Sequence, residues 1–120
     1  MWEVYPEGLK EILISLKKYD KPIIVTENGI ATRNDEQRCR YVVRHLKMLH
    51  EAILNGADVK GYIHWSPMDN FEWSVGYSMK FGLVEVDFET LERKLRPSAY
   101  LYREIAEEDA LLRNHLERYG

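Results

Sequence analysis

The short apolar run at residues 23–29, Ile-Ile-Val-Thr-Glu-Asn-Gly, constrains the fold more than any other part of this chain. It opens with β-branched residues, which is typical of a strand buried on both faces of a parallel sheet. The run brings one carboxylate, Glu27, to its end, and a turn at Asn28-Gly29 follows at once. In α/β folds the ligand binds beyond the carboxyl ends of such strands. Glu27 is therefore a candidate catalytic residue.

A second strand is predicted at residues 59–65, Val-Lys-Gly-Tyr-Ile-His-Trp. The residues that follow, 66–73, read Ser-Pro-Met-Asp-Asn-Phe-Glu-Trp, so carboxylates and an indole gather beyond this strand as well. We interpret His64 as a packed strand histidine, because no second ligand lies at metal-binding spacing. Two strands of this kind in one short chain indicate a sugar-binding site.

Amphipathic helices flank both predicted strands. Pro6 opens the first helix, and its apolar positions follow the helical period. These positions are Leu9, Ile12, Leu13 and Leu16. Asn34 caps a second helix, with Gln37 three positions on, and Asn55-Gly56 ends it. A strand–helix–strand unit of this length predicts two parallel strands joined by a crossover.

The rest of the chain is predicted as an aromatic loop at 66–80, an irregular extended segment at 81–88 and a final helix. Pro97 opens this helix, which carries Leu101, Ile105 and Leu112. The fold class is thus α/β with only two parallel strands, which leaves both sheet edges bare. Because parallel sheets need more strands with helices on their faces, we expect this chain to join a larger sheet.

Composition and charge limit the cellular compartment and the classes of binding partner that we expect. The net charge of −3 has no basic concentration, which argues against nucleic acid or an anionic membrane as partner. No apolar run approaches the ~20 residues of a membrane span, and a signal-peptide pattern is missing, so we expect a cytoplasmic protein. The single cysteine, Cys39, cannot form an internal disulfide or a cysteine metal clamp. We predict it to be solvated at a helix start.

Several motifs in fixed order carry a resemblance to a known family. They are Trp-Glu-Val-Tyr-Pro-Glu-Gly-Leu at 2–9, Val-Thr-Glu-Asn-Gly at 25–29, the segment 61–87, and Arg-Pro-Ser-Ala at 96–99. The chain resembles glycoside hydrolase family 1, the retaining β-glycosidases, and most closely their archaeal β-glucosidase/β-galactosidase branch. One position departs from it, since Pro67 stands where the family most often has leucine.

The resemblance implies that residues 1–120 are a partial domain, the C-terminal part of a (β/α)8 TIM barrel with its seventh and eighth strands and their helices. Glu27 then resembles the nucleophile. Glu72 is similar to the carboxylate that accepts hydrogen bonds from sugar hydroxyls, and Trp73 to an indole donor. An ionised carboxylate only accepts and an indole N–H only donates, which suits these roles. Trp65 would lie against the sugar ring and Phe81 near its far edge. No cofactor or metal is implied.

The implied function is hydrolysis of β-D-glycosidic bonds by a retaining double displacement, within a complete barrel. That mechanism needs two carboxyl groups about 5–5.5 Å apart, one attacking and one protonating the leaving oxygen. The family's general acid follows an Asn-Glu-Pro motif on an earlier strand, and this sequence has none. The resemblance assigns Glu72 to sugar binding rather than to this role. The sequence does not distinguish glucose from galactose.

Three interpretations stay open. The chain is one part of a split enzyme completed by a separate polypeptide with the N-terminal strands, or an inactive remnant that binds carbohydrate weakly. In the third interpretation it is a structural protein whose bare strand edges pair with copies of itself. Simpler roles also exist for single residues: Glu27 as a helix cap or surface residue, Trp65 and Trp73 as core aromatics, and Asp69 as a hydrogen-bond acceptor that structures its loop.

Overall fold

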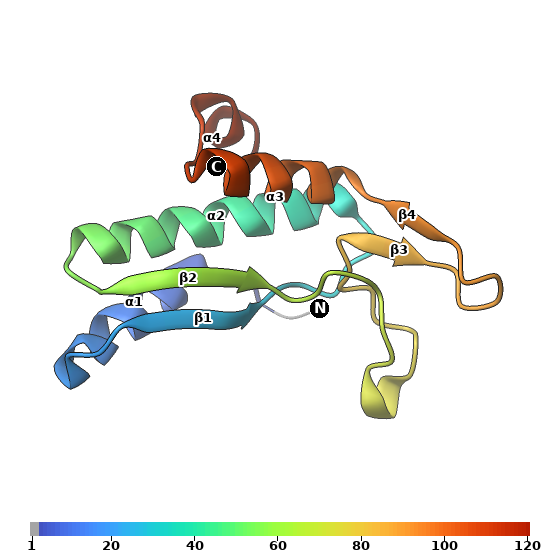
Figure 1. The fold of residues 1–120 in the computed structure, drawn as a ribbon, viewed down its shortest axis with the longest axis horizontal. Helices are drawn as coiled ribbons and strands as arrows, with labels where there is room; N and C mark the ends of the chain where they lie inside the picture. Colours follow the sequence, from blue (N-terminus) through green and yellow to red (C-terminus); the bar gives the residue numbers. More distant parts are fainter. Residues whose placement is uncertain (1–2) are drawn as a thin grey trace.

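The computed structural model describes residues 3–120, so the motif residue Trp2 lies outside the described part of the chain (Figure 1). The elements are α1 (Pro6–Ser15), the 3-10 turn η1 (Leu16–Tyr19), β1 (Ile23–Asn28), α2 (Asp35–Leu54), β2 (Val59–His64), the 3-10 turn η2 (Trp73–Val75), β3 (Val84–Val86), β4 (Arg93–Leu95), α3 (Pro97–Glu108) and α4 (Arg113–Tyr119). Within residues 3–120 no helix is long and apolar enough to cross a membrane.

The predicted strand–helix–strand unit is confirmed. β1 and β2 pair in parallel, with Ile24 opposite Gly61 and Val25 opposite Tyr62, and α2 connects them. One face of this sheet packs against α1 and α2 through a cluster of apolar side chains. The cluster is centred on Leu13, Leu49, Ala52 and Ala57, with Ile23, Val25, Val59 and Tyr62 packed against it. Burial of this face holds the sheet and the two helices together.

The other face of the sheet is bare within the described residues. Ile24 is 57% exposed and Ile63 is 53% exposed, although both stand in strands. Side chains alternate between the faces of a strand, so these residues point away from the helices. This exposed apolar face agrees with the expectation that the chain joins a larger sheet.

Helix α2 begins and ends where the sequence predicts. The Asn34 side chain accepts hydrogen bonds from the backbone N–H groups of Glu36 and Gln37, at 3.1 and 3.4 Å. These bonds satisfy donors that the first turn of a helix leaves without intrahelical partners. At the other end the backbone leaves the helix at Asn55, and Gly56 adopts a positive φ of 87°.

The prediction of a solvated Cys39 is wrong. Its side chain is 1% exposed, because α3 and α4 pack over this part of α2. The cluster that covers it contains Val42, Val43, Leu101, Ile105 and Tyr119. Burial raises the pKa of the Cys39 thiol to about 11. The Cys39 side chain therefore contributes to packing and is not a reactive thiol.

The segment predicted as one final helix forms two helices, and the prediction that Leu112 lies within the helix opened by Pro97 is wrong. α3 ends at Glu108, and Asp109 then adopts a left-handed backbone with φ 49°. Leu112 precedes α4, and its N–H donates to His115 Nδ1 at 3.1 Å. The break allows α4 to turn back so that Tyr119 packs into the α2–α3 cluster.

The extended segment at 81–88 is one arm of a hairpin. β3 pairs antiparallel with β4, with Val84 opposite Leu95 and Val86 opposite Arg93. The turn is held by Asp87, whose carboxylate accepts from the N–H groups of Glu89 and Thr90. Strand β4 was not predicted from the sequence, because its three residues, Arg93, Lys94 and Leu95, show no apolar alternation.

Candidate active site

Glu27 stands next to the last residue of β1, where the pairing with β2 is irregular. The register shifts between Val25 and Asn28, and both Thr26 and Glu27 are exposed. The Asn28 side chain is fastened on the helix side. Its Nδ2 donates to the Tyr41 hydroxyl at 3.2 Å, and its Oδ1 accepts from the Tyr62 hydroxyl at 2.9 Å. Because Val25 and Asn28 both face the helices across this irregularity, the exposed Thr26 and Glu27 lie together on the open side of the sheet.

The ends of the two strands touch each other. The Trp65 N–H donates to the Asn28 carbonyl at 3.0 Å. A Cβ on Gly29 would lie 1.7 Å from the Trp65 carbonyl oxygen, so only glycine fits there. This contact brings the turn after Glu27 against the start of the loop that follows β2. The Trp65–Ser66 peptide bond is cis.

The long loop after β2 is closed at its base by backbone hydrogen bonds. Leu83 donates to the Ser66 carbonyl and Val84 to the Pro67 carbonyl, both at 3.0 Å. The loop leaves the carboxyl end of β2, passes through η2, and returns to β3 (Figure 1). It therefore projects from the carboxyl-terminal end of the sheet, at which β1 also places Glu27; we call this end the site edge.

Asp69 structures this loop from the inside, as predicted by the interpretation of Asp69 as a hydrogen-bond acceptor. Its buried carboxylate accepts two hydrogen bonds from the Arg96 guanidinium, at 3.0 and 2.9 Å, and one from the Gly82 N–H at 2.9 Å. Burial alone would raise the pKa of this carboxyl, but the Arg96 and Gly82 bonds outweigh it and hold the pKa below its usual range. Asp69 is an ionised anchor within the loop.

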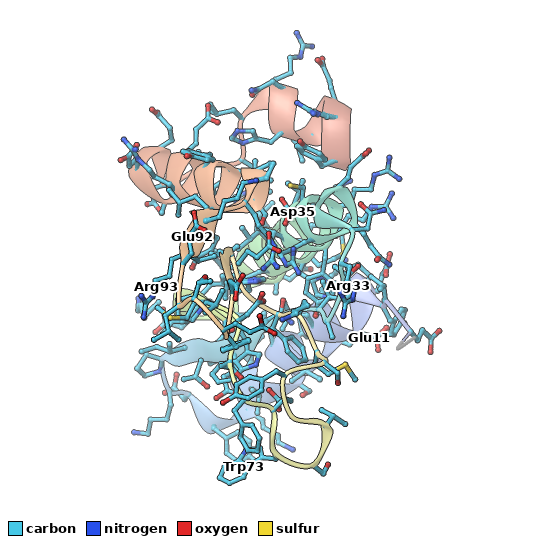
Figure 2. The ribbon with its side chains drawn as sticks, turned by 90° about the vertical axis from the view of Figure 1, so that its right-hand side faces the viewer. Glu11, Arg33, Asp35, Trp73, Glu92 and Arg93 are labelled. Atoms are coloured by element: carbon cyan, nitrogen blue, oxygen red, sulfur yellow. The ribbon has the colours of Figure 1, made fainter. Side chains whose placement is uncertain are left out.

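Trp73 lies at the far end of the loop and is 82% exposed (Figure 2). Its backbone adopts a left-handed conformation with φ 43°, which is uncommon for a bulky residue. The alternative role of Trp73 as a core aromatic is therefore wrong. Neighbouring Glu72 is half-buried, and its N–H donates to the Gly76 carbonyl at 2.7 Å, which closes the tight turn at η2.

The five predicted site residues come from one sheet edge but differ in burial. Glu27 is exposed, Trp65 and Glu72 are half-buried, and Phe81 is buried at the base of the loop. A groove of about 690 Å³ elsewhere in the molecule lies between α2, α3 and α4, and none of the five lines it. Within residues 3–120, the site is thus an open edge rather than an enclosed pocket.

Sequence reasoning missed the residues that hold this edge in place. Asn28 and Gly29 fix the strand ends, and a buried arginine in the first turn of α2, Arg38, ties together the loops beyond them. An amide directly after a carboxylate at a strand end was the available signal for Asn28. No group of three His, Cys, Asp or Glu side chains in residues 3–120 is arranged to hold a metal ion.

His64 is a packed histidine, as predicted, and it directly precedes Trp65. The ring is buried and lies 6.0 Å from the Tyr102 ring, between centroids. Burial lowers its pKa to about 4, although the Phe81 backbone opposes this shift. The imidazole is therefore neutral in the folded chain at neutral pH.

Comparison with known proteins gives concordant matches over most of the chain. The model of the family described as glycosyl hydrolase family 1 matches residues 1–111. The β-galactosidase of Saccharolobus solfataricus is 50% identical over 111 residues, which is 92% of this chain and 23% of the relative. The 6-phospho-β-galactosidase of Staphylococcus aureus is 44% identical over 88% of this chain and 25% of its own length.

Among solved structures, the β-glycosidase from Pyrococcus horikoshii superimposes with a TM-score of 0.97 at 49% identity. The match covers 99% of this chain and 28% of that structure. The chain therefore spans about a quarter of the length of the proteins that it matches.

The buried His64 predicts a specific pH dependence of stability. Between pH 6.5, its ordinary pKa, and about 4, the unfolded chain binds a proton at this ring that the folded chain does not. The free energy of unfolding therefore falls as the pH falls through this window. From pH 7 to pH 4.5 we expect His64 to account for about 2 kcal/mol of the loss.

Urea unfolding of the wild type and of His64→Gln at the two pH values measures this contribution. The variant should lose about 2 kcal/mol less than the wild type over the window. His50→Gln serves as the matched control, because His50 is exposed on the same chain. An identical loss in wild type and His64→Gln would contradict the prediction.

Proposed function

The chain belongs to glycosyl hydrolase family 1, and from that premise we propose that it supplies the nucleophile half of a retaining β-glycosidase site. In this proposal β1 and β2 are the seventh and eighth strands of a (β/α)8 barrel, and residues 1–120 form its C-terminal part. The observation that carries the proposal is Glu27, an exposed carboxylate at a strand end whose neighbour Asn28 is fastened on the opposite face. The bare outer face with Ile24 and Ile63 supports a place inside a larger sheet.

Glu27 attacks the anomeric carbon of a β-glycoside and displaces the leaving oxygen, which forms a glycosyl–enzyme ester. Water then attacks the same carbon and releases the sugar with retained configuration. A second carboxyl group must protonate the leaving oxygen and later activate the water. Because this sequence has no Asn-Glu-Pro motif, that group comes from polypeptide beyond these residues.

The loop after β2 binds the sugar in this proposal. The Glu72 carboxylate accepts hydrogen bonds from two hydroxyls, the Trp73 indole N–H donates one, and Trp65 covers the apolar face of the ring. Phe81 closes the far edge. The exposure of Trp73 supports the assignment, because a tryptophan that is 82% exposed in an uncommon backbone conformation contributes little to this chain's own packing.

Two other functions remain candidates. The exposed Trp73 also favours weak carbohydrate binding without catalysis, since an indole can stack a sugar in the absence of a general acid. Self-association is the third possibility, because both edges of the β1–β2 sheet are unpaired in residues 3–120. Reconstitution with the missing strands separates the three.

The proposal predicts that activity returns when the missing strands are supplied. Co-expression with the part of the Saccharolobus solfataricus β-galactosidase that precedes the matched segment should give turnover of a nitrophenyl β-galactoside or β-glucoside. Glu27→Gln should lower kcat at least about a thousandfold, because it removes the nucleophile. Glu85→Gln, an exposed carboxylate on β3, is the matched control and should leave kcat unchanged. The chain alone should show no turnover.

Failure of a well-folded complex to turn over would contradict catalysis. Sugar-dependent quenching of tryptophan fluorescence that Trp73→Ala abolishes would then favour the binding module. A mass that rises with concentration in sedimentation, without either signal, would favour self-association. Turnover by the isolated chain that Glu27→Gln abolishes would overturn the incomplete-site view.

The electrostatics of the edge also favour a neutral sugar over a phosphorylated one, although similar proteins of both kinds exist. Glu27 and Glu72 are both acidic, and two cations near the loop are already engaged: Arg96, which precedes α3, binds Asp69 at 2.9 Å, and Lys80 lies 3.9 Å from the same carboxylate. A phosphate dianion would meet two carboxylates, while Arg96 and Lys80 are already committed to Asp69. We infer that the glycone is unphosphorylated.

The reconstituted complex should therefore prefer a nitrophenyl β-galactoside over its 6-phosphate. We expect a ratio of kcat/KM of at least about 100, since repulsion of this kind is worth several kcal/mol in a desolvated site. The measurement is a direct comparison of the two substrates at the same ionic strength. A preference for the 6-phosphate would contradict the inference while leaving Glu27 as nucleophile.

A further inference from the structure

Arg38 is the only arginine among residues 3–120 whose residue exposure is 0%. It stands in the first turns of α2, and burial lowers the pKa of its guanidinium while the Asp35 carboxylate opposes the shift. A buried cation is costly unless hydrogen-bonded partners surround it. The partners of Arg38 show what this group holds together.

One nitrogen of Arg38 binds two loops of the candidate site at once. Nη2 donates to the Thr32 carbonyl at 2.5 Å and to the Lys80 carbonyl at 2.7 Å. Thr32 lies in the loop that follows Glu27, and Lys80 directly precedes Phe81 on the returning leg of the loop after β2. The Thr32 N–H also donates to the Lys80 carbonyl at 3.0 Å. The guanidinium thus reinforces a junction between the two loops.

The other nitrogen anchors this junction to the helices. Nη1 pairs with the Asp35 carboxylate, which in turn accepts from the Ser98 N–H at 2.8 Å and the Ser98 hydroxyl at 2.7 Å. Ser98 is the second residue of α3, and Figure 2 shows Asp35 where α2 and α3 meet. The planar fork of a guanidinium can serve three acceptors in fixed directions, whereas an ammonium is a point charge.

We propose that Arg38 is a positioning residue that sets the spacing between the loop after Glu27 and the loop that carries Glu72, Trp73 and Phe81. It acts through the carbonyls of Thr32 and Lys80. This inference rests on the proposed function. Stability alone explains the residue poorly, because replacing a buried ion pair by apolar side chains is often neutral or stabilising. A buried guanidinium that joins two loops of the site instead fixes the distance between these loops.

The variant Arg38→Lys, in the complex reconstituted with the N-terminal polypeptide, tests this role. A lysine keeps the charge beside Asp35 but cannot hold both carbonyls in fixed directions. We expect kcat to fall about 10- to 100-fold, because displacements of about 1 Å cost catalysis this much. KM should change by less than about threefold, since the tip with Glu72 is closed by its own turn.

Arg40→Lys is the matched control. Arg40 lies on the same helix, exposed, and pairs with Glu36 at 2.7 Å. This variant should keep the wild-type kcat and KM. Thermal unfolding of all three proteins separates a loss of kcat from a loss of folded protein.

Hydrogen exchange on the full chain gives a second measurement that needs no activity. In Arg38→Lys the Thr32 amide should exchange at least about tenfold faster, because its acceptor at Lys80 is released, while the amides shared by β1 and β2 stay protected. Wild-type kcat or unchanged Thr32 exchange in a folded Arg38→Lys variant would overturn the proposal. Inactivity of the wild-type complex would refute the proposed function, and Thr32 exchange would then decide the role of Arg38 alone.

Discussion

The contact between the carboxyl ends of β1 and β2 is the interaction on which the candidate site depends. The Asn28 carbonyl accepts from the Trp65 N–H, and Gly29 lies against the Trp65 carbonyl, so the two strand ends meet with no side chain between them. Asn28 uses its amide on the helix side, which leaves Glu27 on the open side of the sheet. A carboxylate and an aromatic loop therefore share one edge, which is where parallel sheets bind ligands.

Around this contact, the loops are held by buried charges in addition to buried apolar side chains such as Ile30, Phe81 and Leu83. Asp69 and Arg96 fix the interior of the loop after β2, and Arg38 joins its returning leg to the loop after β1. The exposed Trp73 is carried outward by a framework in which Arg38 is paired with Asp35 and Arg96 with Asp69. Such a rigid framework suits a binding or catalytic edge, because loops with satisfied polar groups hold their side chains in one geometry.

The face of the β1–β2 sheet that points away from the helices is not covered by the described residues. α1 and α2 cover one side of the β1–β2 sheet, but Ile24 and Ile63 are exposed on the other. A two-stranded parallel sheet buries too little apolar surface to be a typical independent domain. This physical deficit and the span of about a quarter of the matched proteins agree with each other. The chain belongs to a larger architecture in the related proteins, and its proposed chemistry needs a second carboxyl group from beyond it.

Local patterns predicted the parts of the fold that depend on local chemistry. The Asn34 cap and the two strands follow from residue types at short spacing, and Asp69 was predicted as a hydrogen-bond acceptor, but its partners Gly82 and Arg96 are distant in the sequence. Contacts between distant segments could not be predicted in this way. Cys39 was placed in solvent because nothing near it in sequence reveals that α3 and α4 cover it. Besides Asp35, the acceptors of Arg38 are the backbone carbonyls of Thr32 and Lys80, which leave no trace in the residue pattern.

The most direct test of the central claim is to trap the glycosyl–enzyme intermediate. The reconstituted complex would be incubated with a 2-deoxy-2-fluoro β-glycoside that carries a good leaving group, and peptides of this chain would be analysed by mass spectrometry. The account predicts one covalent sugar on the peptide that contains Glu27, absent in Glu27→Gln. A sugar attached to Glu72 or to any other residue, or a complex that turns over substrate without labelling Glu27, would contradict it.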